Sequence, residues 1–246
     1  MQWLTFKKGV FCALRPRLWR HLMQGVAPTI EHIPALSRFS FRTVVDVGAN
    51  RGQFASMARM LFPAADIHSF EPLDEPARTF RSVLGEDGAI HLHSSAIGPE
   101  TTTATIYITT RDDSSSLLQP NKEQEDVFGV RTARTEQIPV KRLSECLNAA
   151  ALNKPALLKI DVQGGELDVL QGSDDLLDCF EVVYIECSYV KMYDNQPLFA
   201  DIVQWMGRHK FAPRGVFNQY NDAHRGPVQA DVLFVRTSND TAERDT

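Results

Sequence analysis

The sequence has no closely spaced pair of cysteines. Its four cysteines, Cys12, Cys146, Cys179 and Cys187, are scattered over 246 residues without a C-x-x-C spacing. This distribution indicates neither a zinc site nor a disulfide framework, and it is typical of buried thiols in a reducing compartment.

Long hydrophobic runs are missing as well. No apolar run approaches the roughly 18 residues that a membrane span needs, and the run from Val10 to Leu14 is too short for the core of a signal peptide. Together with the scattered cysteines, this predicts a cytoplasmic protein.

Basic residues are not in excess. The chain has 26 Lys and Arg against 31 Asp and Glu, which gives a formal net charge of -5. Such a charge offers no long-range attraction to nucleic acid, and no zinc-finger or RNA-reading motif is present. We therefore expect no nucleic-acid partner.

The composition is that of one folded domain with additions. With 43% hydrophobic residues, a chain of this length can bury a full core. We expect an N-terminal helical extension at 1–40, an α/β domain at 41–236 and a flexible, polar tail at 237–246.

The first 22 residues combine apolar residues at helical spacing with basic residues. The apolar set is Trp3, Leu4, Phe6, Val10, Phe11, Leu14, Leu18, Trp19 and Leu22, and the basic set is Lys7, Lys8, Arg15, Arg17 and Arg20. The pattern suits either a helical cap packed on the sheet, which we favour, or a peripheral contact with a membrane surface.

The most informative segment reads V-V-D-V-G-A-N-R-G from Val44 to Gly52. It predicts a short strand buried on both faces, then a tight turn and a helix from Gln53 to Leu61. A second strand, from near Ile67, ends about 20 residues later in Glu71. A carboxylate at that place can accept hydrogen bonds from both hydroxyls of a ribose, so the ligand is expected to contain one.

The first turn does not have the glycines of a dinucleotide site. A pyrophosphate needs glycine at the first, third and sixth positions, which here are Gly48, Asn50 and Gln53. The two polar side chains would crowd a pyrophosphate, whereas they suit the amino-acid tail of S-adenosylmethionine. This disfavours a nicotinamide-dependent oxidoreductase. The predicted cofactor contacts are Asp46, Gly48, Asn50, Gly52 and Glu71, with Ser95 and Ala96 beside the adenine.

Apolar strands alternate with helical segments, which predicts a mostly parallel sheet with helices on both faces. The seven expected strands are 44–47, 67–70, 90–93, 157–160, 182–185, 215–220 and 232–235. Extended patterns at 103–108 and 138–140 indicate a small antiparallel insertion. The polar segment 112–137 is either an acceptor loop or lid, or an ordinary surface insertion.

A second informative segment runs from Leu157 to Gly172 and reads L-L-K-I-D-V-Q-G-G-E-L-D-V-L-Q-G. Its strand ends in Asp161, which we expect to face the same crevice as Glu71, near the methyl group. Glu166 begins the next helix and is either a site residue or a carboxylate at a helix start.

These motifs are similar to those of a known family. They are D-V-G-A-N-R-G, F-E-P, S-A-I-G at 95–98, L-K-I-D-V-Q-G-G-E with V-L-x-G, and I-E at 185–186. From about Phe41 to Arg236, the chain resembles the FkbM family of S-adenosylmethionine-dependent methyltransferases. The resemblance implies a class I methyltransferase fold and methyl transfer to a hydroxyl oxygen, often on a sugar or polyketide. The family more often has glutamate where this chain has Gln163. Nodulation members of the family, which methylate the 2-hydroxyl of fucose on lipo-chitooligosaccharides, have a similar length.

A sugar hydroxyl is a poor nucleophile at neutral pH, so a base must take its proton or a cation must stabilise the alkoxide. The candidate catalytic residues are Asp161, Glu186 and His224. Asp161, Glu186 and Asp231 could together hold Mg²⁺; alternatively, His224 acts alone as the base.

The acceptor is expected to be a small molecule or a glycolipid. Tyr189, Tyr193 and Phe217 could form a stacking surface for a sugar ring, although aromatic residues near strand ends are usually part of the core. A different class of function is a catalytically inactive S-adenosylmethionine-binding module that regulates or scaffolds glycan assembly.

Overall fold

The computed structural model describes residues 8–9, 11–12, 18–111 and 114–237. Within these residues, seven strands form the central sheet in the order β3-β2-β1-β7-β8-β10-β9. The strands are β1 (Thr43–Val47), β2 (Asp66–Phe70), β3 (Ile90–His93), β7 (Ala156–Ile160), β8 (Val182–Ser188), β9 (Phe211–Asp222) and β10 (Gly226–Arg236). Neighbouring strands are parallel except that β10 is antiparallel to both β8 and β9. All seven predicted strands are confirmed.

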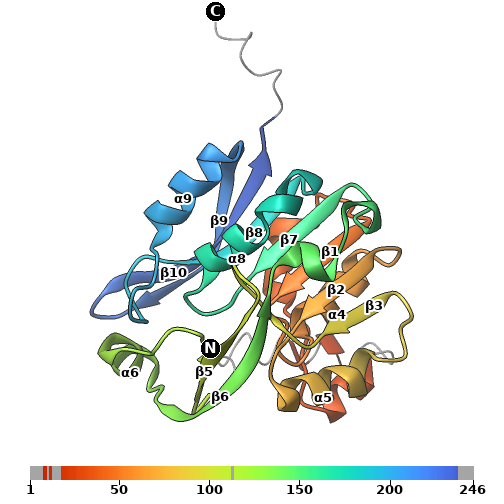
Figure 1. The fold of residues 1–246 in the computed structure, drawn as a ribbon. Coiled ribbons are helices and arrows are strands. Elements are labelled where there is room, and N and C mark those ends of the chain that lie inside the picture. The colour runs from red at the N-terminus through yellow and green to blue at the C-terminus, as the bar shows by residue number, and fades with distance from the viewer. Residues whose placement is uncertain (1–7, 10, 13–17, 112–113, 238–246) are drawn as a thin grey trace, which may run out of the picture.

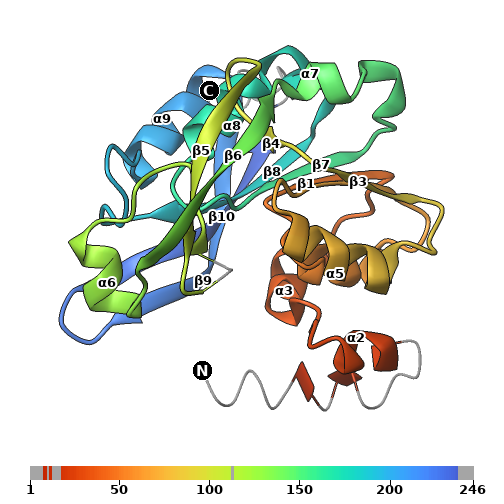
Figure 2. The ribbon, with the colours of Figure 1, turned by 60° about the horizontal axis from the view of Figure 1, so that its bottom comes forward.

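Helices cover both faces of this sheet (Figure 2). One face carries α3 (Ile33–Leu36), α4 (Gln53–Leu61) and α5 (Asp74–Leu84), and the other carries α8 (Glu166–Gly172), η5 (Asp174–Cys179) and α9 (Phe199–Arg208). The remaining short elements are α2 (Trp19–Met23), η2 (Ile30–His32), α7 (Leu143–Cys146) and η4 (Ala149–Ala151).

The core has two halves because side chains alternate along each strand. In β1, Val44 packs into the cluster that contains Phe54 and Phe80 of α4 and α5. Its neighbour Val45 packs into the cluster that contains Leu170 and Met206 of α8 and α9. A strand that is buried on both faces needs apolar residues at consecutive positions, which explains the unbroken apolar run. The fold is the doubly wound, class I methyltransferase type that the sequence predicts.

A second sheet, of three strands, lies beside the first (Figure 1). It consists of β4 (Ala96–Ile97), β5 (Thr102–Thr109) and β6 (Thr132–Lys141), in the order β4-β6-β5. β5 and β6 are antiparallel, as predicted for the insertion, whereas the short β4 is parallel to β6. 

The segment expected to be a polar loop, 112–137, is more regular than predicted. It contains α6 (Lys122–Phe128) and the first part of β6. The side chain of Asn121 accepts hydrogen bonds from the backbone of Glu123 and Gln124, and Gly129 ends the helix in a left-handed conformation. Its polar composition reflects solvent exposure rather than irregular backbone.

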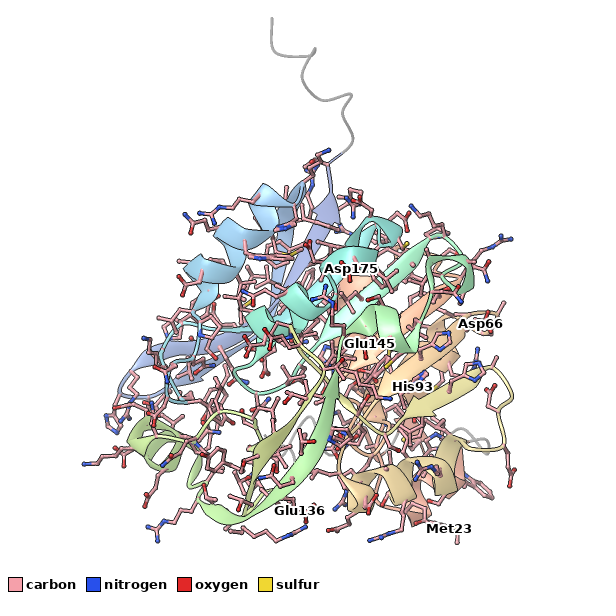
Figure 3. The ribbon with its side chains drawn as sticks, in the orientation of Figure 1. Met23, Asp66, His93, Glu136, Glu145 and Asp175 are labelled. Atoms are coloured by element: carbon pink, nitrogen blue, oxygen red, sulfur yellow. The ribbon has the colours of Figure 1, made fainter. Side chains whose placement is uncertain are left out.

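The N-terminal amphipathic stretch lies largely outside the described residues. Further along the N-terminal segment, α3 packs through Ala35 and Leu36 on the core half that contains α4. Trp19 is 55% exposed and Met23 is 86% exposed; Met23 lies at the outer surface (Figure 3). Over the described part of the chain, no helix has the length and apolar character to cross a membrane. Except for Thr237, the expected tail lies outside the described residues, and the domain boundaries stay predictions.

Candidate functional site

The carboxyl ends of β1, β2 and β7 open into a cavity of about 340 Å³. Parallel strands place their carboxyl ends at one edge of a sheet, which is where open α/β folds bind ligands. The second sheet and the N-terminal segment complete the wall. The lining includes Thr29, Glu31, His32, Gly48, Asn50, Glu71, Ala96, Lys159, Asp161 and Gln163.

The turn after β1 requires glycine at position 48. Gly48 has φ of 84°, and a Cβ there would lie 1.8 Å from the carbonyl oxygen of Asp161. Only glycine lets the turns that follow β1 and β7 approach so closely. The next polar residue, Asn50, has φ of 48°, and its backbone N–H donates to Glu71 Oε2 at 2.9 Å.

Glu71 is a buried carboxylate at the end of β2. In addition to the bond from Asn50, its Oε1 accepts from the backbone N–H of Leu73 at 2.8 Å. Burial raises the pKa of Glu71 to about 7, against the opposing effect of these two donors. Each carboxylate oxygen can accept more than one hydrogen bond, so two ribose hydroxyls could still bind here.

Asp46 lies behind the pocket wall rather than in it. It is fully buried, and its Oδ1 is 3.0 Å from Nζ of Lys159. Lys159 does line the cavity, and its Nζ donates to the carbonyl oxygen of Gly48 at 3.2 Å. Burial opposes the charge on Lys159, but Asp46 and Asp161 outweigh this effect and raise its pKa. The predicted contact of Asp46 with a cofactor is therefore indirect. The signal for Lys159 was its charge within an apolar strand.

Gly52 is also not part of the cavity lining. It has φ of 91°, and a Cβ there would lie 2.8 Å from Leu84 and 2.9 Å from Phe80. This glycine lets the start of α4 approach α5, which gives it a packing role, and its cofactor contact stays a prediction. Of the two residues expected beside the adenine, Ala96 lines the cavity, whereas Ser95 is buried outside the lining.

An amide bridges two of the candidate catalytic carboxylates. The Nε2 of Gln163 donates to Asp161 Oδ1 at 2.8 Å and to Glu186 Oε2 at 2.9 Å. Asp161 lines the cavity and Glu186 does not. Burial, together with the charges of Asp161 and Asp231, raises the pKa of Glu186 well above its usual range. Burial also raises the pKa of Glu166, to about 7, and its Oε1 accepts from the backbone of Gly164 at 2.8 Å.

The structure does not support the magnesium site predicted from Asp161, Glu186 and Asp231. The Gln163 amide occupies the place between the first two carboxylates that a cation would need. Asp231 instead accepts a hydrogen bond from Nδ2 of Asn218 at 2.7 Å. Among the described residues, no group of three carboxylate, histidine or cysteine side chains is arranged to hold a metal ion.

His224 lies away from the cavity. It is exposed in the turn between β9 and β10, where its backbone N–H donates to Asp222 Oδ1 at 2.9 Å. The last two strands form a long hairpin, and this turn lies at its end (Figure 1). A different histidine, His32 of η2, lines the cavity. No specific sequence signal pointed to His32, since it lies in the segment interpreted as a helical cap.

The expected aromatic surface for a sugar is not assembled. Tyr193 is buried and donates a hydrogen bond to the carbonyl oxygen of Ser114 at 3.0 Å. Phe217 packs edge-on against Tyr184, and Tyr189 packs on Phe199. The three side chains belong to separate packing clusters, as is usual for aromatic residues near strand ends.

The polar segment that follows β5 does reach the cavity. Ser115, Ser116 and Leu117 line it, and Ser116 Oγ donates to the carbonyl oxygen of Gln163 at 2.6 Å. This hydrogen bond joins the segment after β5 to the turn after β7, which carries Asp161.

Two buried oxygen atoms of the cavity wall lack a hydrogen-bond partner within the described residues. They are Thr29 Oγ1 and Glu31 Oε2. Together with the Glu71 carboxylate after β2, these two oxygens give the cavity hydrogen-bond acceptors that fit a ribose and a cationic amino-acid tail. The residues present therefore fit S-adenosylmethionine.

Comparisons with known proteins agree with this geometry. The family model described as "Methyltransferase FkbM domain" matches residues 46–213. The 2-O-methyltransferase NoeI of Sinorhizobium fredii is 26% identical over 226 residues, which are 85% of this chain and 93% of that protein. Methyltransferase 1 of Beauveria bassiana is 28% identical over 145 residues, 54% of this chain and 58% of its own length.

Among solved structures, Sp1610 of Streptococcus pneumoniae, in complex with S-adenosyl-L-methionine, is 12% identical with a TM-score of 0.47. That alignment covers 84% of this chain and 72% of the other. The family match spans well over half of the sequence and includes both glycine turns that shape the cavity. The chain therefore belongs to the FkbM family of methyltransferases.

Proposed function

We propose that this protein transfers the methyl group of S-adenosylmethionine to a hydroxyl oxygen of a sugar or glycolipid, with the 2-hydroxyl of fucose on a lipo-chitooligosaccharide as the leading acceptor. The observation that carries the proposal is one cavity lined by both the ribose-binding candidate Glu71 and the strand-end carboxylate Asp161. The name of NoeI, a 2-O-methyltransferase, supports a hydroxyl acceptor.

The chain's own residues would bind the cofactor and orient the acceptor. When bound, S-adenosylmethionine supplies a methyl group on a sulfonium, which is a good leaving group. Glu71 would hold the ribose hydroxyls. Glu31 pairs through Oε1 with Lys8 Nζ at 2.7 Å, and its other oxygen, Oε2, would accept from the cationic tail. Asp161, fixed by the Gln163 amide, would orient the acceptor hydroxyl in line with the methyl carbon. Positioning of this kind supplies much of the rate in a displacement reaction.

The direct test is transfer of labelled methyl to a panel of fucosylated and unfucosylated lipo-chitooligosaccharides. Label on the fucosylated members alone would establish the acceptor, and a Glu71→Ala variant should lose the activity with its cofactor affinity. Label on a different hydroxylated acceptor would withdraw the fucose assignment.

The same assay separates the enzyme from an inactive S-adenosylmethionine-binding module. A module would bind the cofactor in a titration, yet no acceptor would increase the release of S-adenosylhomocysteine. Acceptor-dependent release therefore decides between these two functions.

As the alternative to the helical cap that the sequence favours, we also propose a peripheral membrane contact through the N-terminal basic amphipathic stretch, in a protein expected to be cytoplasmic. The exposure of Trp19 and Met23 supports such a contact. Deleting residues 1–20 should then abolish binding to anionic vesicles. Unchanged vesicle binding, or a loss of solubility with no lipid affinity in the full chain, would support the helical cap instead.

A further inference from the structure

His32 lies in the cavity wall, and its ring contacts side chains of two strands of the central sheet. Its Nδ1 is 3.1 Å from the hydroxyl oxygen of Tyr184 on β8 and 3.2 Å from Asp231 Oδ2 on β10. The side chains of His32 and Asp231 are only 14% and 11% exposed, so little solvent competes for these contacts. Both residues lie outside the span matched by the family model, 46–213.

The amide nitrogen Nδ2 of Asn218 also lies 3.1 Å from Nδ1. Its two hydrogens have other acceptors, Asp231 Oδ2 at 2.7 Å and the Tyr184 hydroxyl oxygen at 3.4 Å. With the amide hydrogens used in this way, the neighbours of Nδ1 favour a proton on that nitrogen. Asp231 is the charged neighbour, and a carboxylate can only accept hydrogen bonds. The hydroxyl oxygen of Tyr184 has two lone pairs, so it can accept from Nδ1–H as well as from the Asn218 amide. Protonation at Nδ1 leaves a lone pair on the other ring nitrogen, Nε2, and a general base requires such a lone pair.

His32 is also close to the groups expected around the methyl carbon. Its ring packs edge-on against Phe54, with ring centroids 5.6 Å apart. Nζ of Lys159 lies 5.3 Å from the centroid of the same phenyl ring and 3.8 Å from Asp161 Oδ2. His32, Phe54, Lys159 and Asp161 all line the cavity, so an acceptor bound beside Asp161 would lie next to the imidazole.

We propose that His32 is the general base of the methyl transfer, and that Asp231 and Tyr184 are positioning residues that fix its tautomer. This inference rests on the proposed function. The acceptor O–H proton moves to Nε2 as the oxygen forms a bond to the methyl carbon and the S–CH₃ bond breaks, with its electron pair going to sulfur. The products are the methyl ether, S-adenosylhomocysteine and an imidazolium, which then releases its proton to solvent.

The kinetic test compares His32→Gln with His224→Gln, which changes a histidine outside the cavity. With the acceptor identified by the panel above, His32→Gln should lower kcat by about 10²- to 10⁴-fold. Its affinity for S-adenosylhomocysteine should stay within about threefold, and His224→Gln should be unchanged. Asp231→Asn should lower kcat by about tenfold with little change in the KM of the acceptor.

A readout independent of activity is the tautomer of His32, from ¹⁵N-histidine NMR of the complex with S-adenosylhomocysteine. We expect a protonated Nδ1 and a bare Nε2 in the wild type, and a shift toward the other tautomer in Asp231→Asn. An Nε2–H tautomer in the wild type would overturn the proposal. So would a kcat within threefold of wild type in His32→Gln, or loss of S-adenosylhomocysteine binding by that variant, which would indicate a structural role.

Failure of the proposed function gives a different result. If the wild type transfers methyl to no member of the panel, the acceptor assignment fails. The NMR tautomer then decides separately whether His32 presents a basic nitrogen to the cavity.

Discussion

Two backbone amides hold the Glu71 carboxylate, and burial shifts its titration into the physiological range. A ligand that brings hydroxyl donors to this carboxylate compensates for its lost hydration, so binding and ionisation are linked. The residue should therefore control both the affinity for the cofactor and its dependence on pH.

Glu71→Gln should weaken binding of S-adenosylhomocysteine by about 10- to 100-fold, since a hydrogen bond to a charged group contributes about 1.5–3 kcal/mol. The pKa of the Glu71 carboxyl group is about 7. In the wild type, the affinity for S-adenosylhomocysteine should therefore rise from pH 6 to pH 8, as this group loses its proton. The glutamine variant should lose this rise. Calorimetric titration measures both effects, and Glu75→Gln, whose side chain is 65% exposed on α5, is the matched control. Equal affinities at both pH values in the wild type would contradict the assignment.

Gln163 separates two carboxylates by donating to both. Gln163→Glu would replace this donor with a third carboxyl group, so we expect a loss of about 1–3 kcal/mol in the free energy of unfolding at pH 8. Urea denaturation measures the loss. Gln219→Glu changes an exposed glutamine on β9 and should have almost no effect. A variant as stable as the wild type would show that the bridge contributes nothing.

At the scale of elements, the V-L-x-G and S-A-I-G motifs meet in space. A Cβ on Gly172, the last residue of α8, would lie 2.1 Å from the carbonyl oxygen of Gly98, which follows β4. The two glycines let a helix end contact the backbone beside the second sheet. Their presence in the sequence therefore reflects packing between elements.

Gly172→Ala should lower the free energy of unfolding by about 1–3 kcal/mol, because backbone must move to admit the methyl group. Gly207→Ala in α9 is the matched control, since a Cβ there meets no atom within 4 Å. Alanine should stabilise that helix by up to about 1 kcal/mol. Thermal denaturation of both variants tests the pair, and equal effects of the same sign would contradict the packing argument.

Strands buried on both faces of the sheet were predictable from sequence, because β1, β7 and β8 are short and mostly apolar, and β1 and β7 are each followed by a glycine turn. The element that was missed, α6, carries polar residues such as Lys122 and Glu123, so no apolar period marks it. Its signals were local instead, an Asn at the N-cap and a Gly at the C-cap.

At the scale of the whole molecule, buried carboxyl groups make stability depend on pH. Burial raises the pKa of Glu166 to about 7, above its ordinary value of 4.5. Below pH 4.5 the group is protonated in both folded and unfolded chains. Between pH 4.5 and 7 the unfolded chain loses the proton first, so the stability that this group contributes at low pH is lost as the pH rises through 7.

Glu166→Gln should remove this dependence, because an amide does not ionise and its oxygen can still accept from Gly164 N–H. The variant should gain stability over the wild type between pH 5 and pH 8, by up to about 3 kcal/mol. Urea denaturation at the two pH values measures the difference. Glu100→Gln, at an exposed position, should follow the wild type. A difference that does not grow with pH would be evidence against the shift.

The cofactor half of the site follows from local sequence, since Gly48, Asn50 and Glu71 lie at strand ends that the motif itself defines. The other half does not. His32 and Asp231 come from opposite ends of the chain, and their contact depends on the order of strands in the sheet. No local pattern encodes which histidine reaches the cavity, which explains why the sequence singled out His224 and not His32.

The contact between His32 and Asp231 of β10 also bears on the order in which parts of the site are made during synthesis. The turns and Glu71 that would hold a cofactor are all made before β10, whereas Asp231 leaves the ribosome only after nearly the whole domain. A chain that stops before β10 would have every motif of the family match, yet its η2 histidine would have no carboxylate partner from this strand. Domain limits drawn from the family match alone would omit the wall residues Thr29, Glu31 and His32, as well as Asp231.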